Sequence, residues 1–136
     1  MLNRTQALVV GFLVAAWASL MAIMAAAPDI VRDQLQAPAD SQRSAETLLL
    51  AGVWVVVGVG LLGVIQRWRW MFWLLLVASL GGALRVPAAA LQVAGIVPTS
   101  IPGWYILFQA TIGVIQFAIG VAMLAGYRRH GVWGPF

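Results

Sequence analysis

Residues 67–86 read RWRWMFWLLLVASLGGALRV, and Pro87 follows directly. The stretch opens with two arginines among tryptophans, continues as an uncharged apolar run, and carries Arg85 near its end. A bilayer-spanning helix needs about 20 predominantly apolar residues, so the stretch predicts a transmembrane helix that contains a charged side chain. Gly81, Gly82 and Pro87 flank Arg85, which predicts a bend in this helix.

The whole chain has the composition of a membrane protein. It has 136 residues, of which 62% are hydrophobic and 9% are charged, and its mean hydropathy is +0.94. Soluble domains carry about 25% charged residues. The sequence therefore predicts an all-α, integral membrane four-helix bundle with an antiparallel up-down order, formed by one transmembrane domain over residues 1–136. The spans are expected at about 7–27, 47–65, 70–94 and 103–126, with an extracytoplasmic loop over 28–46.

The distribution of arginine predicts the orientation. If all four segments span, five arginines fall on one side: Arg4, Arg67, Arg69, Arg128 and Arg129. Arg32 and Arg43 fall on the other side, among all four acids of the chain. The positive-inside rule then places both termini in the cytoplasm. We expect a multi-pass protein of the bacterial inner (cytoplasmic) membrane. The net charge of +4 is explained by arginines that determine the orientation in the membrane, and we expect no nucleic-acid binding.

Arg85 is the first candidate for a functional site. An arginine at the centre of a membrane helix costs about 2.5–3.5 kcal/mol on insertion scales and by default has a partner. Glu46, Gln92 and Gln109 are expected at the same end of the bundle, so these residues and Arg85 are the predicted binding site for an anionic or polar head group. Two alternatives stay open: a structural ion pair with hydrogen bonds that fixes helix register, and a contact to another subunit.

The fourth span presents a stripe of amides and glycines. Gln109, Gly113, Gln116 and Gly120 follow i, i+4, i+7 and i+11 and share one helix face. We expect Gly113, Gln116 and Gly120 to pack against a neighbouring helix, together with Gly58 of the second span. The alternative is a polar path along the bundle. Trp17 and Trp54 lie deep inside their spans, where they either fill gaps between helices or face a partner.

Catalytic and metal-binding motifs are not recognisable in the sequence. The chain has no cysteine, and its one histidine, His130, follows Arg128 and Arg129 at the expected membrane surface. No phosphate-binding loop and no Ser/His/Asp set is present. We therefore expect no enzyme, no metal and no cofactor, and leave a bound lipid open.

The chain resembles a bacterial family of small four-helix integral membrane proteins. That family is known only as a domain of unknown function. The matching features are Pro28 after the first apolar run, Glu46, Gly52, Gly58 and Gly60 in the second, and Gly81-Gly82-Ala83-Leu84-Arg85 in the third. The resemblance covers roughly residues 7–129 and implies the fold but no activity. The family often has an acid in its fourth helix, where this chain has Gln109 or Gln116.

Two functions are compatible with this reading. The first is a non-catalytic accessory or structural subunit of a larger bacterial membrane complex of the respiratory, photosynthetic or transport kind. The second is a lipid- or small-molecule-binding or transport protein that uses a polar pocket around Arg85 in the outer leaflet. The expected partners are membrane lipids and either other membrane subunits or further copies of this chain.

Overall fold

The computed structural model describes residues 1–30 and 39–136, and all regular secondary structure in that part of the chain is helical. Four helices are long and apolar enough to cross a membrane: Arg4–Ala26, Arg43–Ile65, Arg69–Val93 and Gly103–His130. They agree with the predicted spans to within four residues at each end. Arg32, Asp33 and the middle of the loop predicted over 28–46 lie outside the described residues.

The first two long helices pack side by side. Helix α1 (Arg4–Ala26) begins with a capping box, in which the Asn3 side chain accepts from the Gln6 amide and the Gln6 side chain accepts from the Asn3 amide. A short 3-10 turn, η1 (Ala39–Ser41), leads into helix α3 (Gln42–Ile65). Trp17 of α1 and Trp54 of α3 meet edge to face with ring centroids 4.9 Å apart. The two deep tryptophans therefore contact each other between α1 and α3, while Trp54 stays 57% exposed.

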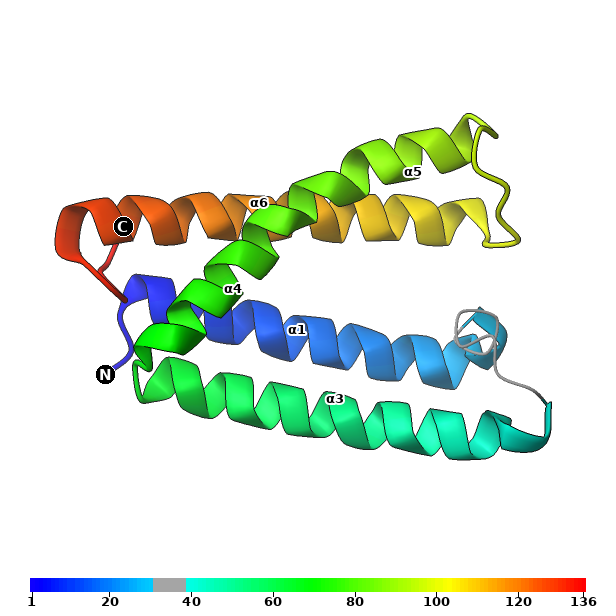
Figure 1. Cartoon of the computed structure of the whole chain (residues 1–136), viewed down its shortest axis with the longest axis horizontal. Coiled ribbons are helices and arrows are strands. Elements are labelled where there is room, and N and C mark those ends of the chain that lie inside the picture. The colour runs from blue at the N-terminus through cyan, green and yellow to red at the C-terminus, as the bar shows by residue number, and fades with distance from the viewer. Residues whose placement is uncertain (31–38) are drawn as a thin grey trace.

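The third span is interrupted by a tighter turn. Helix α4 (Arg69–Gly81) passes through the 3-10 segment η2 (Gly82–Leu84) into helix α5 (Arg85–Val93). Pro87 lies in the first turn of α5, where its missing N–H group costs no helical hydrogen bond. The predicted irregularity thus falls directly before Arg85. Figure 1 shows α4 and α5 crossing the molecule diagonally, from the end of α3 toward helix α6 (Gly103–His130).

A tightly packed core joins the helices at the end that holds both termini (Figure 1). It consists of the buried side chains of Val9, Val64, Met71, Phe72, Leu76, Ile119, Met123 and Trp133. The chain turns back after Gly131, which has a φ of 82°, and this turn brings Trp133 over the ring of Phe72. Trp133 is only 2% exposed. The tail after α6 is therefore part of the core.

Buried polar groups hold the same end together. Gln6 donates from Nε2 to the carbonyl of Val64 at 2.7 Å, and Thr5 donates from Oγ1 to the carbonyl of Gly134 at 2.7 Å. The Asn3 side chain donates to the carbonyl of Trp133. Since both Thr5 and Gln6 are 1% exposed, these hydrogen bonds are shielded from solvent. They connect the start of α1 to the end of α3 and to the tail.

Candidate functional site

Arg85 heads a short chain of hydrogen bonds between α5 and α6. Its Nη1 donates to Oε1 of Gln109 at 2.8 Å, and Nε2 of Gln109 donates to the hydroxyl oxygen of Tyr105 at 2.8 Å. Tyr105 and Gln109 are four residues apart on α6 and therefore lie one above the other on the same helix face. Among the described residues, Gln109 is the hydrogen-bond partner of the guanidinium group, which has five N–H donors in all.

These side chains border a pocket of about 240 Å³ between α5 and α6. The lining residues are Arg85, Ala88, Ala89, Gln92, Ile101, Tyr105, Ile106 and Gln109. The pocket thus brings together three of the four residues in the predicted site. Tyr105 belongs to it as well, although the sequence analysis did not include it. Its spacing of four residues from Gln109 was the signal that could have found it.

Glu46 does not line this pocket. It lies in the first turns of α3, and α1 stands between α3 and α6 (Figure 1). The expectation that Glu46 and Arg85 share one site assumed that the third span stays beside the second along its whole length. The structure differs because α4 leaves α3 and crosses diagonally, which carries Arg85 to α6 instead.

Glycines set the distance between α6 and the η2 turn. A Cβ atom at Gly113 would lie 2.7 Å from the carbonyl oxygen of Gly82 and 2.8 Å from Cβ of Arg85. One at Gly120 would lie 3.1 Å from Leu80. Gln116 packs its Cβ against Gly82, and its Oε1 is buried without a hydrogen-bond partner in the described structure. The predicted face of Gly113, Gln116 and Gly120 is therefore the surface that α4, η2 and α5 cover.

Gly58 has a different environment from the other predicted packing residues. A Cβ atom there would meet nothing within 4 Å. The close contacts of α3 are made nearer to its C-terminal end, where Gly63 would place a Cβ 2.8 Å from Met71. Helix α3 approaches its neighbours at Gly63 because the chain reverses direction a few residues later. The surface around Gly58 is left open.

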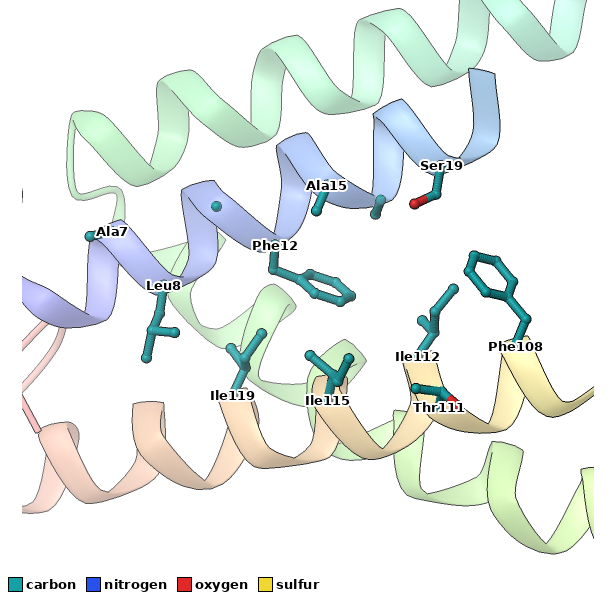
Figure 2. Close-up of a pocket in the computed structure, with 12 residues that line it drawn as sticks. Ala7, Leu8, Phe12, Ala15, Ser19, Phe108, Thr111, Ile112, Ile115 and Ile119 are labelled. Atoms are coloured by element: carbon teal, nitrogen blue, oxygen red, sulfur yellow. The ribbon is translucent and has the colours of Figure 1, made fainter. Parts of the chain in front are cut away.

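A second, apolar cleft separates α1 from α6, as Figure 2 shows. Its volume is about 440 Å³, within the range of small-molecule sites. Gly11, Ala15 and Ser19 form its α1 wall, and the side chains of Phe12 and Phe108 point into the space from opposite helices (Figure 2). The cleft lies on a different face of α6 from the Arg85 pocket. Hydrocarbon is the chemical class that suits its lining.

No group of three or more His, Cys, Asp or Glu side chains is arranged to hold a metal ion within residues 1–30 and 39–136. Comparison of the chain with protein-family models, with curated proteins and with solved structures finds no match. What the fold and the site define together is a helical protein with four candidate membrane spans and a polar pocket built around one arginine.

Proposed function

We propose that this chain is a multi-pass membrane protein that binds an anionic amphiphile through the pocket at Arg85. The observation that carries the proposal is the hydrogen-bond chain from Arg85 through Gln109 to Tyr105 along one wall of that pocket. Gln109 holds the guanidinium in place but is neutral, so the positive charge has no ionic partner in this contact. A phosphate or carboxylate is the group that a guanidinium binds best, often with two parallel hydrogen bonds.

The size and surroundings of the pocket limit what it can hold. A volume of about 240 Å³ admits a small head group rather than a whole lipid. Gln92 and the Tyr105 hydroxyl offer further polar contacts beside Arg85. The apolar cleft between α1 and α6 can take a hydrocarbon chain. The pocket therefore favours a ligand with a compact negative head, and the cleft on the other face of α6 is a separate surface that suits hydrocarbon.

The proposed insertion is antiparallel and up-down, with both termini in the cytoplasm. In support, the end that holds both termini also holds Arg67 and Arg69 of the α3–α4 turn and Arg128 and Arg129 of α6. The positive-inside rule assigns such an end to the cytoplasm. The Arg85 pocket then lies in the outer half of the membrane. We also propose that the membrane is the bacterial inner membrane, and that the chain is related to the four-helix family of unknown function that it resembles.

Arg85→Ala should abolish retention of the amphiphile without unfolding the protein. The guanidinium is exposed and its one hydrogen bond here is to a side chain, so little packing is lost. The protein would be extracted from its own membrane in a mild detergent and analysed by native mass spectrometry for bound molecules, with thermal unfolding measured in parallel. Arg43→Ala, which removes an exposed arginine at the start of α3, is the matched control.

An unchanged set of bound molecules in Arg85→Ala, combined with lower thermal stability, would assign Arg85 a structural role and overturn the proposal. Loss of the same bound molecules from both Arg43→Ala and Arg85→Ala would also count against the proposal. Loss of an anionic species at Arg85 alone, with the unfolding temperature preserved, is the expected result.

An exposed surface on α3 favours a second candidate function, that of an accessory subunit of a larger complex. Trp54 on α3 is 57% exposed, and Cβ atoms at Gly52 and Gly58 of the same helix would meet nothing within 4 Å. Small residues beside a large ring suit close approach by another membrane helix. Under this reading, native mass spectrometry of the extracted protein should show this chain with a fixed stoichiometry of larger subunits. A lone 14.6 kDa species or a homo-oligomer would exclude it.

A further inference from the structure

The end of the molecule opposite the Arg85 pocket carries a cluster of exposed arginines, which we call the basic collar. Its members are Arg4, Arg67, Arg69, Arg128 and Arg129. They come from the start of α1, the α3–α4 turn and the last turn of α6. The indole of Trp133 donates to the carbonyl of Trp68 at 3.0 Å, and the rings of Trp73 and Tyr127 lie 5.1 Å apart. These contacts keep the turn beside the end of α6.

Helix electrostatics disfavours two members of the collar. Arg4 is the first residue of α1 and Arg69 is the first residue of α4, and neither helix has an acid in its first turn. The N-terminal end of a helix carries a partial positive charge, so a cation there is unfavourable. The stability of α1 and α4 therefore gives no reason for arginine at these two positions.

Backbone geometry disfavours a third member. Arg67 has a φ of 57° in the left-handed region, at the position that follows the end of α3. The amide of Trp68 donates to the carbonyl of Gly63 at 2.9 Å, as in the helix-ending motif whose left-handed residue is usually glycine. A side chain with a Cβ atom is strained in this conformation. Backbone conformation alone would favour glycine here, so it gives no reason for arginine at this position.

The charge of the collar is not balanced by acids in the described part of the chain. Asp40 precedes α3, Glu46 lies in its first turns, and Asp29 follows α1, so the described acids are all at the other end (Figure 1). Five exposed guanidinium groups therefore face outward at one end with no acidic side chain among them. Orientation in the membrane accounts for a positive end, and an anion outside the chain would in addition neutralise its charge.

We propose that the basic collar binds the phosphates of anionic phospholipids in the leaflet at that end. Trp70 and Trp73, which are 54% and 43% exposed, lie at the same end as the collar. Exposed indoles at the ends of spans sit at the level of lipid head groups. Guanidinium groups bind phosphate in a bidentate manner, and clustered basic residues next to spans attract anionic lipid. This inference does not rest on the function proposed for Arg85, which is at the opposite end.

The test uses the full chain in an Arg85→Ala background, so that lipid held at Arg85 does not contribute. The protein is reconstituted in bilayers with equal amounts of phosphatidylcholine and phosphatidylglycerol, extracted in a mild detergent, and analysed for bound lipids by native mass spectrometry. Phosphatidylglycerol should be enriched over the bilayer ratio, and the enrichment should fall as salt is added. Changing any one collar arginine to glutamine should lower the enrichment of phosphatidylglycerol about fivefold. Arg43→Gln should leave it unchanged.

Arg67→Gly provides a second signature that separates charge from fold. It should raise the unfolding temperature in phosphatidylcholine, because the strain at Arg67 is removed, and at the same time lower the preference for phosphatidylglycerol. Bound lipids at the bilayer ratio would overturn the proposal and point to an acidic protein as the partner of the collar. Equal losses in Arg43→Gln and Arg67→Gln would overturn it too, because the effect would then reflect net charge alone.

Discussion

Replacing Trp133 by alanine should lower the free energy of unfolding by about 3–5 kcal/mol, the range for a large aromatic side chain in a core. The side chain is 2% exposed and packs edge to face on Phe72 with a centroid distance of 5.3 Å. Its Nε1 also donates to the carbonyl of Trp68, so the substitution removes packing and a hydrogen bond together. Denaturation of the purified protein in one detergent, followed by circular dichroism, measures the change.

Trp54→Ala is the matched control, because it removes the same side chain from a position that is 57% exposed. Its edge-to-face contact with Trp17 is worth about 0.5–1.5 kcal/mol beyond burial, so a loss near that size is expected. If Trp54→Ala were as destabilising as Trp133→Ala, the packed end described here would not be the centre of stability.

Gly113→Ala should destabilise the protein by about 1–3 kcal/mol, the usual cost of extra volume in a packed interior. The added methyl group would lie 2.7 Å from a backbone carbonyl oxygen, that of Gly82, and 2.8 Å from Cβ of Arg85. Backbone cannot move aside as a flexible side chain can, so α6 and η2 must separate. The separation should also lengthen the contact between Arg85 and Gln109 and weaken retention of any molecule held there.

Gly58→Ala is the control for this substitution, since its methyl group would meet nothing within 4 Å. Alanine is favoured over glycine inside a helix by about 0.5–1 kcal/mol, so this variant should be as stable as the original or slightly more stable. Unfolding transitions of the two variants, measured side by side, check the prediction. A destabilised Gly58→Ala protein would show instead that another chain covers α3 at this position.

Local patterns in the sequence predicted the helices and part of the site. The apolar runs set the spans, and the 3.6-residue period placed Gly113, Gln116 and Gly120 on one face, which α4 and η2 do cover. Arg85 and Gln109 were expected at a similar depth in two spans that a short link joins. In the structure Nη1 of Arg85 donates to Oε1 of Gln109. Each of these placements depends on one helix or on two neighbouring helices, so local patterns can indicate it, while the binding role of Arg85 stays a prediction.

The features that the sequence did not reveal depend on contacts between distant residues. Glu46 was grouped with Arg85, yet the direction that α4 takes after the Arg67 turn separates α3 from α5. The role of Trp133 depends on the turn at Gly131 and on hydrogen bonds to Asn3 and Trp68. Neither partner is near the tail in sequence, so no local pattern indicated these contacts.

The difference between the two ends of the molecule has a mechanical consequence. Helices α1, α3, α4 and α6 meet in the core at the end with both termini, and a cleft lies between α1 and α6 (Figure 1). Helix α6 has 28 residues and is about 42 Å long. For a helix of that length, a tilt of about 5° about the joined end would move the far tip by about 4 Å. A spanning helix accommodates a change in hydrocarbon thickness partly by tilting, so we expect the width of the cleft to depend on the thickness of the bilayer around it.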